Sequence, residues 1–177
     1  DTEACEKITS FLVLCDSFNI PIVLFVDTPG FAIGTDAERK RAPGKIMNFM
    51  NAMTLVTVPH LSVIIRKSYG RAYVCMGGGR HSDDIAAWPT AEISVMSPEF
   101  ATTIVHGDKP GDADFEARYA ETEQGSDVWG LAAVFAAQAV IRPSETRDYL
   151  IRMLEVHRLR ITNGVGEHLM RAWPTSF

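Results

Sequence analysis

Four glycines and several basic residues gather in one short stretch, residues 66–81, whose sequence is RKSYGRAYVCMGGGRH. It follows an apolar, β-branched run at residues 61–65 that predicts a buried strand. The glycines Gly70, Gly77, Gly78 and Gly79 allow the backbone to come close to a ligand. The basic side chains make the local field positive in a chain whose formal net charge is −5. This pattern favours an anion or an oxyanion as the ligand. A structural strand-to-helix turn with solvated charges is the alternative.

A second candidate is the turn Asp27-Thr28-Pro29-Gly30. It ends the continuous apolar run of residues 21–26, which is typical of a strand inside a parallel sheet. Ligands of α/β folds commonly lie at the carboxyl ends of such strands. We therefore expect this turn to lie near a ligand.

Other polar groups favour structural roles. His81 with Asp83 and Asp84 could suggest a metal or a catalytic base, but two neighbouring carboxylates point in different directions, so a polar loop is the better interpretation. We predict no metal site. No serine lies in a nucleophile-elbow context, which argues against acyl-enzyme hydrolysis. Three more histidines have no partner spacing and are expected to be structural: His60, His106 and His157.

Length and composition narrow the class of protein. The 177 residues suit one domain with a substantial core. Net acidity argues against a nucleic-acid partner, and no apolar run approaches the length of a membrane span. Cys5, Cys15 and Cys75 have neither an even count nor metal-like spacing, which indicates reduced thiols of an intracellular protein.

Strand-like and helix-like segments alternate along the chain. This order predicts an α/β domain with parallel strands and right-handed crossovers. Asp1 and Ser97 are suited to cap helices, Ser144 is expected to cap the last one, and Phe11 is expected on the apolar stripe of the first. The expected helices are residues 2–17, 44–57, 98–106, 115–123, 128–137 and 145–157, with a short helical turn at 35–38. The expected strands are residues 21–26, 61–65, 85–88, 92–96 and 139–141.

Four segments in this order resemble one family, the carboxyltransferase (β) subunits of biotin-dependent acyl-CoA carboxylases of the propionyl-CoA carboxylase type. They are CDSFNIPIVLFVDTPGF (residues 15–31), VTVPHLSVIIRKSYGRAY (56–73), AWPTAEISVM (87–96) and IRPSETR (141–147). The resemblance implies a ClpP/crotonase-like spiral of ββα units. It covers the carboxyl-terminal domain of a family subunit only and suggests that the fold is incomplete at its amino end. We expect residues 1–162 to form this domain and residues 163–177 to form a tail.

The resemblance also implies an activity, the transfer of a carboxyl group from carboxybiotin to the α-carbon of a short-chain acyl-CoA. The catalytic groups would be the backbone amides of Arg71 and Ala72, which stabilise developing negative charge. The same resemblance assigns the biotin and acyl pocket to Thr28, Pro29, Gly30, Phe31, Tyr69, Gly70, Tyr73 and Val74.

Partners follow from the same resemblance. They are the amino-terminal carboxyltransferase domain, which completes the active site across a protomer boundary, and a biotin carboxyl carrier or biotin carboxylase subunit. A homo-oligomer in the cytoplasm, or in the mitochondrial matrix of a eukaryote, is expected.

Two residues depart from the family pattern. Arg71 stands where the family normally has glycine, and a glycine-only conformation there would cost an arginine roughly 1 to 3 kcal/mol. Val74 replaces an acidic residue often found in propionyl-type enzymes, which suggests a more apolar acyl pocket. Two alternatives stay open: a non-catalytic crotonase-fold assembly module disabled by Arg71, and an enoyl-CoA hydratase or isomerase, for which no well-placed carboxylates stand out.

Overall fold

The computed structural model describes residues 1–78, 81–125, 127–133 and 135–160. Within them, one five-stranded sheet has the order β1-β2-β3-β5, and β4 also pairs with β2. Every pair of these strands is parallel, as the alternation of strands and helices predicts. The strands are β1 (Ile22–Thr28), β2 (His60–Tyr69), β3 (Asp84–Ala87), β4 (Glu92–Ser94) and β5 (Ala139–Val140).

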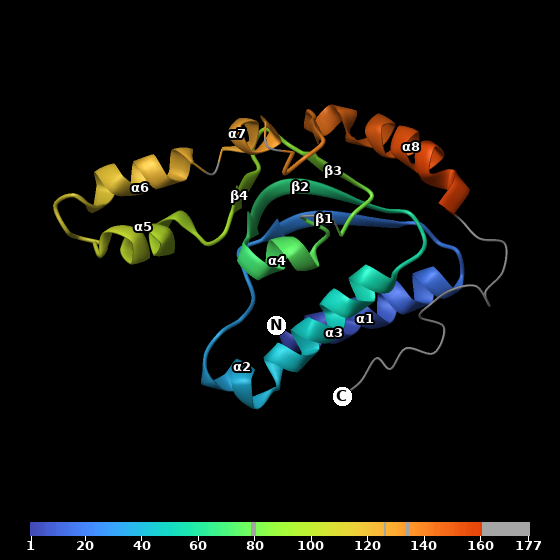
Figure 1. Cartoon of the computed structure of the whole chain (residues 1–177), viewed down its shortest axis with the longest axis horizontal. Helices are drawn as coiled ribbons and strands as arrows, with labels where there is room; N and C mark the ends of the chain where they lie inside the picture. Colours follow the sequence, from blue (N-terminus) through green and yellow to red (C-terminus); the bar gives the residue numbers. More distant parts are fainter. Residues whose placement is uncertain (79–80, 126, 134, 161–177) are drawn as a thin grey trace.

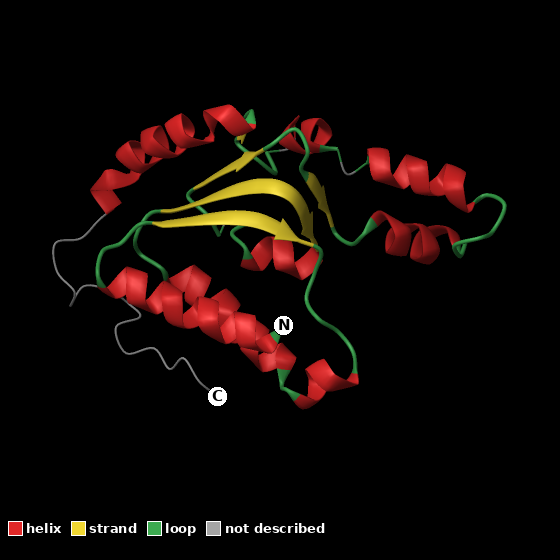
Figure 2. Cartoon of the chain, turned by 180° about the vertical axis from the view of Figure 1, so that it is seen from behind, coloured by secondary structure: helices red, strands yellow, loops and turns green. Residues whose placement is uncertain are grey.

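Helices cover both faces of this sheet, and two of them project from it (Figure 1). On one face lie α1 (Thr2–Ser17), α3 (Ala42–Leu55) and the short α4 (Gly70–Cys75), with α2 (Thr35–Arg39) leading into α3. On the other face lies α8 (Thr146–His157), while α7 (Val128–Ala133) lies beside β4 and β5. Helices α5 (Pro98–His106) and α6 (Phe115–Gln124) form a hairpin that extends away from the sheet, as Figure 2 shows from behind. Short 3-10 turns, η1 (Pro143–Glu145) and η2 (Arg158–Arg160), flank α8.

Helix α1 is fixed at both of its ends. Asp1 caps it by accepting a hydrogen bond from the Ala4 amide at 2.8 Å, as the sequence predicts. At the other end the fully buried Asp16 accepts hydrogen bonds from the Thr57 amide at 2.7 Å and the Val58 amide at 3.1 Å. Because Thr57 and Val58 connect α3 to β2, this carboxylate ties the helical layer to the central strand.

The core lies between the sheet and the α1–α3 layer. Leu12 from α1, Ile22 from β1, Phe49 and Met53 from α3 and Cys75 from α4 are buried in one cluster. The opposite face has a smaller cluster around Val63, Ala86 and Ile141, which α8 covers with Tyr149 and Leu150. Strand β2 is buried on both faces over its first half, which explains its unbroken apolar run.

The bend of β2 directs the chain toward α4. From Ile22 to Val26 the register with β2 is regular, but Val26 pairs with Ile64 while Thr28 pairs with Ser68. Three residues of β2 therefore stand opposite Asp27, which makes an irregularity of the β-bulge kind. Beyond it, β2 leaves β3 and pairs with β4.

Several local predictions were wrong, each for a visible reason. The apolar helix expected at 128–137 ends at Ala133, because Phe135 has a left-handed backbone with φ 60°. Ser144 does not cap α8, since residues 143–145 form a 3-10 turn and Glu145 occupies the N-cap position. Phe11 is 57% exposed, because the buried stripe of α1 is narrower than its apolar pattern.

The expected tail at 163–177 lies outside the described residues.

Candidate functional site

The turn between β2 and α4 depends on one glycine. Tyr69 is extended and occupies the N-cap position of α4, and Gly70 follows with φ +61°, in the left-handed region. A Cβ atom on Gly70 would stand 2.9 Å from the carbonyl oxygen of Val95, closer than real Cβ contacts come. The turn therefore needs glycine at position 70 for both its conformation and its space.

Arg71 does not occupy a glycine-only position. It lies inside α4 with an ordinary helical backbone, since the described non-glycine residues with positive φ are Asn19, Arg41 and Phe135. Arg71 therefore has no left-handed backbone strain, because the left-handed conformation of this turn belongs to its neighbour Gly70. The substitution at position 71 thus leaves the turn intact.

The first turn of α4 presents backbone amides. The N–H groups of Gly70, Arg71 and Ala72 precede the first i to i−4 hydrogen bond of the helix, and the Tyr69 side chain does not cap them. The partial positive charge of a helix start favours a negative group beside such amides. Arg71 has an exposed side chain, whereas Ala72 is buried.

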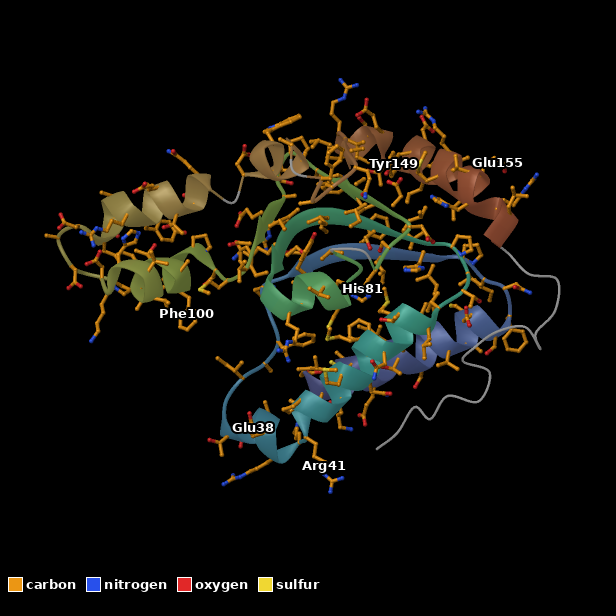
Figure 3. All side chains as sticks on the ribbon, in the orientation of Figure 1. Glu38, Arg41, His81, Phe100, Tyr149 and Glu155 are labelled. Carbon is orange, nitrogen blue, oxygen red and sulfur yellow. The ribbon has the colours of Figure 1, made fainter. Side chains whose placement is uncertain are left out.

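A cleft of about 700 Å³ opens beside this turn. One wall is the segment after β1, with Pro29, Gly30 and Phe31, and the floor includes Tyr69, Gly70 and Arg71. The opposite walls come from α2 and α3 and from the β4–α5 region. Glu38 on α2 and Phe100 on α5 lie on different sides of the opening (Figure 3).

A second cavity of about 640 Å³ lies on the other side of the same turn. Tyr73 and Val74 of α4 line it together with Ile93 of β4, and its lining is mostly apolar. Gly70, Arg71 and Val95 line both cavities, so these residues form the boundary between them.

Two of the residues assigned from the sequence line neither cavity. Thr28 pairs with Ser68 in the sheet, and Ala72 lies on the buried side of α4. Thr28 thus contributes to the position of the segment 29–31, and Ala72 faces the cleft through its backbone at most.

The basic residues of the central stretch have different roles. Arg66 forms an ion pair with Asp27, with 3.1 Å between Nη2 and Oδ2, so its guanidinium is already engaged. Hydrogen bonding from Arg66 lowers the pKa of Asp27 below its ordinary value, which keeps the carboxylate ionised. Arg71 lines the cleft, while Gly79 and Arg80 lie outside the described residues. Among the cleft-lining residues, Arg71 is the cation, and Glu38 and Glu99 are acidic.

Tyr69 is fixed by burial and by a hydrogen bond to β4. Its ring is buried, and its hydroxyl donates a hydrogen bond to Glu92 of β4. Burial, followed by the hydrogen bond and the charge of Glu92, raises the pKa of Tyr69, so this phenol stays protonated. Tyr69 therefore anchors the turn and is not a base at neutral pH.

The polar loop after α4 has structural contacts. The Asp83 carboxylate accepts from the His60 amide at 2.9 Å, His60 Nε2 contacts the His81 carbonyl oxygen, and the Tyr149 hydroxyl donates to Asp84. Within the described part of the chain, no three histidine, cysteine, aspartate or glutamate side chains gather in a way that could hold a metal ion. The described helices likewise include none that could cross a bilayer.

The far side of the cleft was not anticipated from the sequence. Val95 is 80% exposed and lines both cavities, while Glu38, Glu99 and Phe100 line the larger one. In the sequence, Glu38 lies in the expected helical turn and Glu99 and Phe100 lie at the start of an expected helix. Val95 lies within the strand expected at 92–96, but β4 ends at Ser94. These positions do not reveal which loops meet in space.

Comparisons with known proteins agree on one family. The family model described as "Carboxyl transferase domain" matches residues 1–163. A propionyl-CoA carboxylase carboxyltransferase subunit of Haloferax mediterranei is 41% identical over 89% of this chain and 33% of its own length. The methylmalonyl-CoA decarboxylase subunit alpha of Veillonella parvula is 37% identical over 87% of this chain and 30% of its own length. The chain thus spans about a third of the length of these relatives.

Solved structures resemble the fold closely. The transcarboxylase 12S structure with methylmalonyl-coenzyme A and methylmalonic acid bound superposes with a TM-score of 0.85 at 34% identity, over 90% of this chain and 31% of that one. The geranyl-CoA carboxylase beta subunit of P. aeruginosa gives a TM-score of 0.79 at 25% identity, over 90% and 33%. These neighbours confirm the crotonase-like α/β fold that the sequence resemblance implies. The chain belongs to the carboxyl transferase domain family.

Proposed function

We propose that this chain forms the biotin-side part of a carboxyltransferase site, which moves a carboxyl group from carboxybiotin to the α-carbon of a short-chain acyl-CoA. The observation that carries the proposal is the turn at Gly70, which sets the first amides of α4 beside a 700 Å³ cleft. Family membership gives the reaction class. The turn supplies donors of the kind that this class of reaction requires.

The cleft is suited to biotin in size and in lining. Ligand pockets of this class are about 300 to 1,000 Å³ and mainly apolar with a few polar groups. Here Phe31, Ile46 and Phe100 offer apolar surface for a ring and its aliphatic arm. The amides of Arg71 and Ala72 would donate to the ureido oxygen. Carboxybiotin, when bound, supplies the carboxyl group that is transferred.

The chain's own contribution is electrostatic. Backbone amides can stabilise a developing negative charge without introducing a competing base, and they need little reorganisation because the helix already fixes them. Tyr69 and Gly70 hold these amides in position, through the Glu92 hydrogen bond and the left-handed turn respectively. The Arg71 guanidinium adds a cation near the carboxyl group.

The second cavity is the proposed acyl pocket. Val74, Tyr73 and Ile93 line it, and Val74 brings a methyl surface where an acidic residue would bring charge. An uncharged short acyl chain suits such a lining better than a charged one, because a buried carboxylate would need a partner.

The partners and place of action are part of the proposal. We infer that residues 1–162 act as the carboxyl-terminal domain, and that an amino-terminal carboxyltransferase domain completes the site. A biotin carrier or biotin carboxylase subunit would deliver the carboxyl group to a cytoplasmic homo-oligomer. In support, the relatives above are subunits, and the transcarboxylase 12S neighbour assembles as a hexamer.

The test joins this chain to an amino-terminal carboxyltransferase half and supplies carboxybiotin and propionyl-CoA. We expect carboxyl transfer by the wild type, and retained transfer with weaker carboxybiotin binding in Arg71→Gly, since the turn depends on Gly70. Arg71→Lys, which keeps the cation, is the matched control and should bind carboxybiotin more tightly than Arg71→Gly. Absence of transfer in every combination would overturn the proposal.

The same assay separates the alternatives. A non-catalytic assembly module would show no transfer and no biotin binding in the wild type or in Arg71→Gly. An enoyl-CoA hydratase would hydrate crotonyl-CoA, and the presence of Glu38 and Glu99 on the cleft wall makes this assay worthwhile. Both carboxylates are exposed, so we expect no hydration.

A further inference from the structure

The irregularity in β2 lies immediately before the candidate site. Residues 65–67 of β2 stand opposite the single residue Asp27 of β1. In a regular ladder, one residue of β2 would pair with Asp27. Such bulges bend a strand, increase its twist and re-aim the residues that follow. Here the residues that follow are Ser68, Tyr69 and the Gly70 turn.

Side chains hold this bulge from both edges. On the β1 edge, Asp27 accepts hydrogen bonds from the Lys67 amide at 3.1 Å and from Arg66 Nε at 3.2 Å. On the opposite edge, the Thr90 hydroxyl donates to the Ile65 carbonyl oxygen at 2.7 Å. The displaced backbone therefore keeps hydrogen-bond partners that the strand ladder does not give it.

Asp27 connects the two strand ends that build the cleft. It immediately precedes Thr28 and the lining segment 29–31, and it fixes Lys67, three residues before Gly70. Beyond the bulge, Tyr69 pairs with Ser94 of β4, which brings Gly70 against the Val95 carbonyl. The position of the α4 amides thus depends on how β2 bends at Asp27.

We propose that Asp27 is a positioning residue, which fixes the bulge of β2 through Lys67 and Arg66 and thereby aims the first amides of α4 into the cleft. This rests on the proposed function, because the amides matter for the reaction only if they stabilise charge in it. Asp27 itself lines neither cavity, so its proposed role is to position other groups.

A purely stabilising role explains the contacts less well. The side chains of Arg66 and Asp27 are 59% and 33% exposed, and ion pairs this open to solvent contribute little to folding. Their geometry is nonetheless specific, since the guanidinium and the Lys67 amide converge on one carboxylate. The low pKa of Asp27 keeps that carboxylate charged.

The experiment compares Asp27→Ala and Asp27→Asn in this chain joined to an amino-terminal carboxyltransferase half. Asparagine can still accept from the Lys67 amide but loses the charged pair with Arg66. The control is Glu155→Ala. It removes another exposed ion pair, between Glu155 of α8 and Arg158 of η2, and Glu155 lies at the far side of the molecule from the cleft (Figure 3). Amide hydrogen exchange at residues 70–72 and steady-state carboxyl transfer are measured together.

We expect Asp27→Ala to exchange faster at residues 70–72 and to lose kcat by about 10- to 100-fold, since small misplacements of catalytic groups have effects of that size. KM for the acyl-CoA should change little, Asp27→Asn should fall in between, and Glu155→Ala should match the wild type. If Asp27→Ala does not fold, the Asn variant decides by the same two measurements.

Unchanged exchange at residues 70–72 would overturn the proposal, even if kcat falls. Faster exchange with unchanged kcat would overturn it as well, because the turn would then be held by Asp27 without effect on the reaction. A wild-type protein without carboxyl transfer would refute the proposed function. The exchange measurement would still show in that case whether Asp27 fixes the turn.

Discussion

Replacement of Gly70 by alanine adds only one methyl group, but we expect it to displace the turn at the start of α4. Gly70 has φ +61°, and a Cβ atom there would meet the Val95 carbonyl oxygen at 2.9 Å. The contact cannot be relieved by a flexible side chain, since the oxygen belongs to the backbone just after β4 and Gly70 follows directly on the paired end of β2. The structure must therefore shift at the α4 turn, at the end of β4, or at both.

The cost has two separable parts. A left-handed conformation costs a non-glycine residue roughly 1 to 2 kcal/mol. Relief of an overpacked contact in a fixed environment typically costs about 1 to 3 kcal/mol more. We therefore expect Gly70→Ala to lower the free energy of unfolding by about 2 to 5 kcal/mol.

Gly107 provides a matched control for the conformational part. It ends α5 with φ +79°, and a Cβ atom there would meet nothing within 4 Å. Urea unfolding of Gly70→Ala and Gly107→Ala should therefore differ by the contact with Val95, about 1 to 3 kcal/mol. Equal destabilisation by the two substitutions would refute the claim that the Val95 carbonyl closes on this turn.

Three further predictions follow from other contacts. Asp16→Ala should lower the free energy of unfolding by about 3 kcal/mol or more in urea titrations, because it leaves the Thr57 and Val58 amides without their acceptor. A loss below about 1 kcal/mol would contradict the claim that Asp16 ties α1 to the start of β2. The buried thiols of Cys5, Cys15 and Cys75 should resist iodoacetamide in the native protein and react with it in urea. Burial raises the pKa of each thiol, that of Cys75 to about 12. Labelling of Cys75 in the native protein, read by mass spectrometry, would contradict its burial at the end of α4. The Asp27–Arg66 pair should stabilise the fold above the ordinary Asp27 pKa of 3.8 and lose this effect as the pH falls through the lowered pKa of the folded protein. In urea unfolding, Asp27→Asn should therefore be slightly less stable than the wild type at neutral pH and equal to it in strong acid. A difference in stability that persists in acid would contradict this reading of the ion pair.

Much of the central layer could be predicted from the sequence because its signals are local. The β-branched run before residue 66 has few alternatives to a buried strand, and β2 occupies this run in the structure. The short helix α4 after it was not among the helices expected from the pattern of residues. The cap at Asp1 needs only a carboxylate and the amide of Ala4, three residues later. The strand and the cap depend on neighbours in the chain, and the structure confirms them.

Features that depend on distant contacts could not be predicted in this way. Whether Arg71 is strained depends on which residue of the turn is left-handed, and composition does not reveal that this residue is Gly70. The bulge opposite Asp27 depends on the register of two strands, which a hydrophobic pattern does not fix to within two residues. The cleft wall at Glu99 and Phe100 depends on where the β4–α5 connection places a helix.

The central claim is that the Gly70 turn serves carboxyl transfer, and one measurement tests it most directly. This chain, joined to an amino-terminal carboxyltransferase half, is given propionyl-CoA and carboxybiotin with a radiolabelled carboxyl group. The label that appears on the acyl-CoA is followed. We expect transfer by the wild type and a loss of about 100-fold or more in Gly70→Ala, because the charge-stabilising amides move. Transfer that is absent in the wild type, or equal in the two proteins, would contradict this account.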